Sequence, residues 1–107
     1  MPNVRKTFDR YKVQYTASKR SLPLASITCY NGETPVGLLE FVQTAGELSD
    51  PFIHQPSGMI FLPYLLGRFH DVLDLLRNEG PLELYFNPDG KWASILTSEA
   101  EPVGEGE

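Results

Sequence analysis

The sequence predicts a single α+β domain. Its expected order is four strands of an antiparallel sheet, then one long main helix, then a C-terminal β-hairpin, and the sheet packs on the helix. Three observations predict it. Apolar residues recur at three- and four-residue spacing between Leu62 and Gly80, side chains alternate in the segments around that stretch, and turn formers separate the alternating runs. With 107 residues, 41% of them hydrophobic, the chain can bury one core. We expect residues 1–97 to form this domain and residues 98–107 to be a disordered acidic tail.

The main helix is predicted between Leu62 and Gly80. This stretch has room for about four turns, Pro63 suits the first turn, and Gly80-Pro81 is a stop signal. Six large apolar residues would share one stripe that the sheet must cover, namely Leu65, Leu66, Phe69, Val72, Leu73 and Leu76.

One flank of this helix carries Tyr64, Arg68 and Leu75, which belong neither to the apolar stripe nor to the polar face. Two interpretations are open. The three residues could lie over a sheet edge, or they could form a second, smaller apolar contact for a partner chain. A protein partner would also use the long loop around Phe52.

The N-terminal segment from Lys6 to Ser18 alternates as a half-buried strand does. Three cations and one aromatic ring share a parity, so they would stand about 6.6 Å apart on one face. That spacing is close to the phosphate repeat of an extended nucleic-acid strand, and the ring could stack on a base. The alternative is a solvated strand face kept positive for solubility. The candidate nucleic-acid-binding residues are Lys6, Phe8, Arg10 and Lys12 of this strand, with Lys19 and Arg20 of the connection that follows it.

Asn31-Gly32 predicts a two-residue hairpin loop between two strand-forming runs. This loop would set Ile27 opposite Val36 on an apolar face. It would also place Pro35 at a hydrogen-bonded position, so a longer turn or a bulge is an open alternative.

The C-terminal hairpin is predicted by the alternation from Leu82 to Phe86 and by the turn formers Pro88-Asp89-Gly90. A three-residue loop would pair Phe86 with Trp92. This pairing places the Trp92 ring in the core, with a surface stacking platform as the alternative.

No residue pattern indicates catalysis or a cofactor. The single cysteine, Cys29, excludes an internal disulfide and a cysteine-rich zinc site. Asp50, His54 and His70 lack the spacing of metal ligands. Because phosphate loops, nucleophile elbows and paired histidines are also missing, we expect a protein that is not an enzyme and holds neither cofactor nor metal.

The net charge of −5 conceals an asymmetry. Residues 1–20 hold six cations against one acid, which gives +5, and the rest of the chain holds three cations against thirteen acids, which gives −10. A local basic face can therefore exist on an acidic protein. The longest apolar run is too short to span a bilayer and the first residues are charged, so we expect a cytoplasmic protein without membrane contact.

One part of the chain resembles the positive cofactor four and Whirly class of single-stranded DNA-binding folds. The likeness covers about residues 24–78 and rests on Leu39-Glu40-Phe41, the run Gly58 to Pro63, and Phe69. The resemblance implies four antiparallel strands followed by one helix, a transcription-cofactor-like role and a homodimer formed through helix and sheet. The sequence departs from that class because residues 21–67 contain no lysine or arginine.

The hypothesis for function is a small non-enzymatic module, in the form of a homodimer, that binds single-stranded DNA or RNA through the basic N-terminal strand. The alternative hypothesis is a protein–protein interaction or regulatory subunit that uses the helix flank and the loop at residues 43–57. In that case another protein, not nucleic acid, is the partner.

Overall fold

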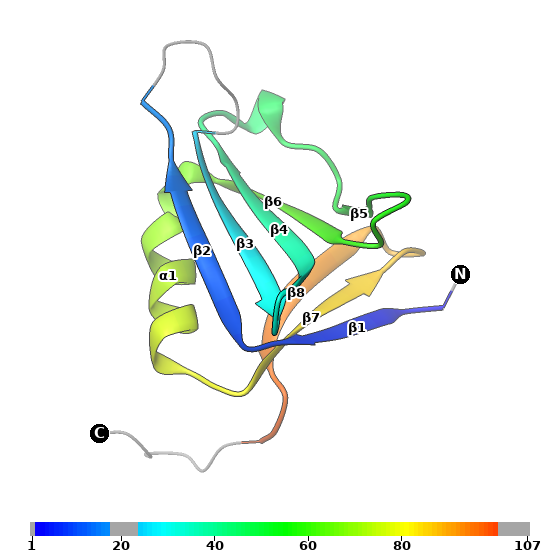
Figure 1. The fold of residues 1–107 in the computed structure, drawn as a ribbon. Coiled ribbons are helices and arrows are strands. Elements are labelled where there is room, and N and C mark those ends of the chain that lie inside the picture. The colour runs from blue at the N-terminus through cyan, green and yellow to red at the C-terminus, as the bar shows by residue number, and fades with distance from the viewer. Residues whose placement is uncertain (1, 18–23, 101–107) are drawn as a thin grey trace.

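Two sheets and one α-helix make up the part of the chain that this computed structural model describes, residues 2–17 and 24–100. The three-stranded sheet has the order β1-β7-β8, and the five-stranded sheet has the order β2-β3-β4-β6-β5 (Figure 1). The elements are β1 Val4–Phe8, β2 Arg10–Tyr15, β3 Ala25–Asn31, β4 Thr34–Val42, η1 Ala45–Glu47, β5 Phe52–Ile53, β6 Ile60–Leu65, η2 Leu66–Arg68, α1 Phe69–Asn78, β7 Leu82–Asn87 and β8 Trp92–Thr97.

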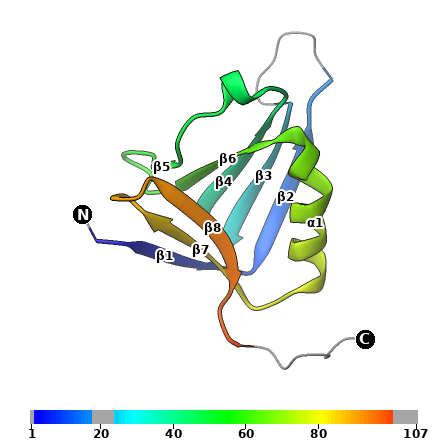
Figure 2. The same cartoon turned by 180° about the vertical axis from the view of Figure 1, so that it is seen from behind.

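Helix α1 and the three-stranded sheet lie on the same side of the five-stranded sheet, as Figure 2 shows from behind. The core fills the space between these layers. Ile27, Leu39 and Leu62 of the large sheet meet Leu84 of β7 and Phe69 of α1 in one cluster of buried side chains. The other side of the five-stranded sheet is covered by no helix or strand among the described residues, and we call it the open face.

Gly37 of β4 lets the two sheets approach each other closely. A Cβ at this position would collide with the Leu84 side chain of β7 and would lie 3.3 Å from the carbonyl oxygen of Ile60. Because Leu84 is fully buried, its side chain has little room to move. Glycine is therefore required here to bring β7 against β4.

The α+β class is confirmed, but the expected architecture was wrong in its details. The described residues form eight strands in two sheets instead of four strands in one. The sheet is also not fully antiparallel, because β6 pairs with β4 in parallel. The connection at residues 43–57 contains η1 and β5 and returns the chain to the start of β6, as a parallel pairing requires.

The predicted helix was too long at its N-terminal end. Strand β6 runs through Pro63 to Leu65, and α1 spans only the ten residues Phe69–Asn78. Pro63 is tolerated in β6 because β5 pairs only with Ile60 and Phe61, so the outer edge of β6 at Pro63 faces no partner strand among the described residues. The predicted end is confirmed. The part of the apolar stripe that is both helical and buried is Phe69, Val72, Leu73 and Leu76.

The N-terminal strand was predicted as one ribbon and is in fact two strands in different sheets, with Asp9 between them. The backbone N–H of Asp9 donates to the Tyr30 carbonyl at 2.9 Å, and its carboxylate accepts from the Gly32 N–H at 3.0 Å. Both bonds fasten the junction to the β3–β4 hairpin. The chain therefore changes sheets here, since β1 pairs with β7 while β2 pairs with β3.

Both hairpins differ from the predicted register. The β3–β4 loop is Gly32-Glu33, with Gly32 at φ 63°, and a shift between Cys29 and Tyr30 sets Ile27 opposite Leu39. The bulge alternative is thus confirmed.

In the C-terminal hairpin Trp92 pairs with Asn87 across a four-residue loop. Trp92 consequently lies on the outer side of the sheet with 47% of its surface exposed, so its expected place in the core was wrong.

Stability is expected to fall at alkaline pH because of two groups in the core region. Burial raises the pKa of Cys29 from 9.0 to about 12, and burial, with a smaller effect of the Cys29 charge, raises the pKa of Tyr64 from 10.0 to about 12. A raised pKa in the folded state means that folding favours the neutral form. The contribution of these two groups to the stability of the fold is therefore complete below about pH 9 and is lost as the pH rises toward 12.

Melting temperatures measured between about pH 8 and 11 check this expectation. We expect a steady decrease above pH 9 that is shallower in Cys29→Val, a variant of similar size without a titrating group. Equal pH dependence in the two proteins would contradict the role given to Cys29.

Candidate functional site

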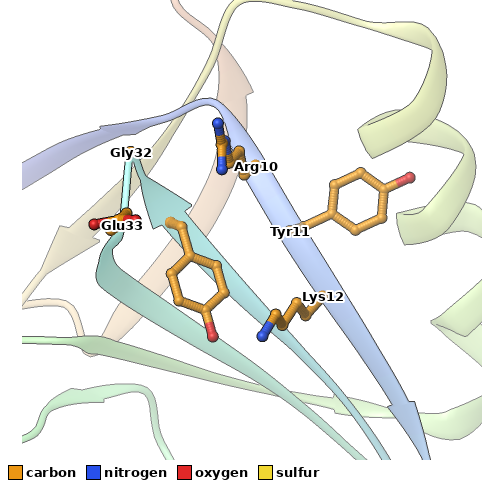
Figure 3. A pocket seen from close by; sticks show the side chains of 6 residues that line it. Arg10, Tyr11, Lys12, Gly32 and Glu33 are labelled. Carbon is orange, nitrogen blue, oxygen red and sulfur yellow. The ribbon is translucent and has the colours of Figure 1, made fainter.

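The open face carries the cations of β2 beside an aromatic side chain of β3. Arg10 pairs with Tyr30, and Lys12 with Thr28, so these four side chains share the side of the sheet away from α1. The Lys12 ammonium lies 5.8 Å from the centre of the Tyr30 ring. Arg10, Lys12, Tyr30 and the turn residue Glu33 line one shallow hollow of about 390 Å³. Figure 3 shows Arg10 and Lys12 on the side of the hollow, while Tyr11 points toward the helix.

A row of side chains continues from this hollow across the whole sheet. By register Lys12 is followed by Thr28, Leu38, Phe61 and Phe52 on the same face. With about 4.8 Å between neighbouring strands, the row is roughly 19 Å long. It leads from the cations on β2 to aromatic rings on β6 and β5.

Aromatic rings gather at the far end of this row. The Phe61 ring centre lies 4.8 Å from that of Phe52 and 5.4 Å from that of His54, whose ring is within 16° of parallel to it. Phe52 is 41% exposed. His54 is held in place by a 2.7 Å contact between its Nδ1 and the Ser57 hydroxyl. The open face thus offers ring surfaces at two places, around Tyr30 and around Phe61.

The two cations of the hollow have no acidic partner in the described part of the chain. The one ion pair between described residues joins Arg5 to Glu83 on the other sheet, where Arg5 also lies over the Tyr85 ring. Glu33 lines the hollow without an ion pair to either cation, and no other acidic side chain of the described residues lines it. Arg10 and Lys12 are therefore exposed charges available to an anionic ligand.

The structure keeps only part of the predicted nucleic-acid site together. Arg10 and Lys12 lie side by side on the open face, whereas Lys6 belongs to β1 in the other sheet and is half-buried. Phe8 is 8% exposed and packs in the core, so the prediction that its ring stacks on a base was wrong. Lys19 and Arg20 lie outside the described residues, as do positions 101–107 of the predicted tail.

Tyr30 and Phe61 were missed as candidates. Their strands were predicted and each ring has the parity opposite to a buried neighbour, Cys29 or Leu62, so alternation alone would have placed both rings on the outer side. What alternation could not provide is the pairing that puts them on the same face as Arg10 and Lys12.

The predicted partner residues divide between two surfaces. Tyr64, Arg68 and Leu75 line one groove between α1 and β8. Phe52 lies on the open face instead, in contact with Phe61. The first three thus share one surface, whereas Phe52 lies apart from them because β5 pairs with the outer edge of β6. Their role as a partner interface stays a prediction.

Comparison with known proteins returned no matching family model, no matching curated protein and no matching solved structure. In the described residues no helix has the length and apolar character needed to cross a membrane. No cluster of three or more potential metal-ligating side chains occurs in residues 2–17 and 24–100. The likeness to single-stranded DNA-binding folds, the homodimer and the cytoplasmic location stay predictions.

Proposed function

We propose that this protein is a small, non-enzymatic module that binds single-stranded nucleic acid on the open face. The observation that carries the proposal is the position of Arg10 and Lys12, exposed and without a carboxylate partner in the described chain, beside the Tyr30 ring. Phosphate contacts fix a strand on the protein, and ring surfaces accept its bases.

The binding mode follows from the row across the sheet. Phosphates pair with Arg10 and Lys12, and a base stacks on Tyr30 while the Lys12 ammonium leaves the ring for the phosphate. The strand then crosses β4 toward Phe61, where a second base meets the rings of Phe61 and Phe52. About 10 Å separates β3 from β6, which are two strand spacings apart.

A single strand suits this face better than a duplex does. The open face presents half-buried apolar and aromatic side chains on a sheet, and these contact the flat surfaces of unpaired bases. In a duplex the bases are stacked on one another, so only the two cations would contribute. We therefore expect little sequence preference and weak duplex binding.

Fluorescence anisotropy with a labelled oligothymidylate of about twelve nucleotides tests the proposal, because such binding sites cover about 4–16 nucleotides. Two phosphate contacts predict a slope of about −1.4 for the logarithm of the binding constant against the logarithm of salt concentration, and contacts from Lys19 and Arg20 would steepen it. An unlabelled duplex of the same length should compete poorly. Absence of binding at about 50 mM salt, or equal competition by the duplex, would overturn the proposal.

A further inference from the structure

The groove between α1 and β8 lies away from the open face, on the side of the molecule seen in Figure 2. It is an open hollow with a volume of about 470 Å³. Leu75 and Val72 of the helix form one wall, and Ala93 and Ile95 of β8 form the other. Tyr64 also lines it, and Arg68 lines it at the start of the helix.

The β8 wall of this groove is the free edge of a sheet. In the order β1-β7-β8 the only partner of β8 among the described strands is β7, so the backbone groups along its other edge have no strand to pair with. An edge of this kind is a template for another extended chain. Here the unpaired edge and the apolar wall of α1 face the same groove.

The groove continues along β8 into a second hollow. The two hollows share Tyr64 and Ala93, and the second adds Pro63, Lys91 and Trp92. Trp92 is 47% exposed, and a large ring of this kind is a frequent anchor in protein interfaces. A continuous track therefore runs beside β8 from Trp92 to Ile95.

We propose that this track binds an extended segment of a partner protein, which adds to β8 as a fourth strand. Alternate side chains of the segment are apolar and enter the groove between α1 and β8, because successive side chains of a strand point to opposite sides. Three charged side chains line the track, the cations Arg68 and Lys91 and the acid Asp71. The segment therefore carries an acidic residue next to Arg68.

Space in the groove favours a single strand over a second copy of this chain paired through β8. A β8–β8 pairing would bring the β7 strand of the copy about 10 Å from β8, two strand spacings away. The residues of α1 that line the groove stand on that side of β8. A single added strand needs only one strand spacing beside β8, whereas a second copy would bring its whole sheet against the residues of α1 that line the groove.

Selection from a random heptapeptide library displayed on phage, with the full-length protein as bait, tests the inference. We expect the selected peptides to alternate apolar residues and to carry an acid on one side. Synthetic peptides can then be titrated directly, because Trp92 is the only tryptophan and its emission should shift as the track fills. Failure to enrich any peptide would overturn the inference.

Two variants locate the site of binding. Arg68→Glu changes an exposed side chain and should lower the affinity for an acidic peptide by about tenfold. A peptide with lysine in place of the acid should regain affinity for this variant. Leu75→Lys should lower the affinity for both peptides by about a hundredfold. Asp74→Lys, which is next to Leu75 in sequence but on the exposed face of α1, is the matched control and should change the affinity for neither peptide.

Equal affinity of the peptides for the parent protein and both variants would overturn the inference. So would a dimer of the free protein that Leu75→Lys dissociates, because the occupant would then be a second copy. Oligothymidylate binding should be the same in all three variants at about 150 mM salt, where distant charges are screened. The two binding proposals can therefore fail independently.

Discussion

Replacing Phe41 by alanine is expected to lower the free energy of unfolding by about 3–5 kcal/mol, the range for a large aromatic residue removed from a core. Phe41 is fully buried. Its ring stacks on Tyr64 of β6 with centres 5.6 Å apart and meets Phe69 of α1 edge-on at 5.1 Å. The substitution thus removes the side chain that joins β4 to both β6 and the helix. Urea denaturation followed by circular dichroism gives the difference.

Phe52→Ala is the matched control, because it removes the same atoms from a ring that is 41% exposed. Its only described ring partner is Phe61, and its strand β5 has two residues. We expect a loss below about 1 kcal/mol, as for most surface positions. If both variants lost the same stability, the helix would not be held to the sheet through Phe41 as described.

The C-terminal part of the helix could be predicted from the sequence because its signals are local. Spacing places Phe69, Val72 and Leu76 on one stripe, and Gly80-Pro81 ends the helix wherever the rest of the chain lies. The N-terminal part could not be predicted in the same way. Pro63 is equally suitable for a first helical turn and for an edge of β6, and the choice depends on the parallel pairing with β4, a strand about twenty residues earlier.

The division of the N-terminal segment had no local signal at all. Alternation correctly predicted extended structure on both sides of Asp9, but the change of sheet depends on bonds from Asp9 to Tyr30 and Gly32. The same division explains why the candidate site was only partly predicted. It places Phe8 in the core and leaves Arg10 and Lys12 on the open face, beside rings whose position depends on strand pairing.

Reversing both cations of the hollow, in Arg10→Glu with Lys12→Glu, should lower the affinity for oligothymidylate by about a hundredfold or more at 50 mM salt. Each substitution removes one phosphate contact and adds a repulsive charge beside Tyr30. The salt slope should also decrease by about 1.4, the value for two lost contacts on a single strand. Both side chains are exposed and have no acidic partner among described residues, so the fold should be retained.

The decisive control is a variant with the same net charge. Arg68→Glu with Arg77→Glu changes the charge of the protein equally, but in η2 and α1, on the other side of the five-stranded sheet. A general electrostatic effect would weaken binding in both double variants and would decline with salt in the same manner. A site on the open face loses affinity only when Arg10 and Lys12 are reversed, and Tyr30→Leu should then weaken binding further at every salt concentration, because base stacking does not depend on counterion release.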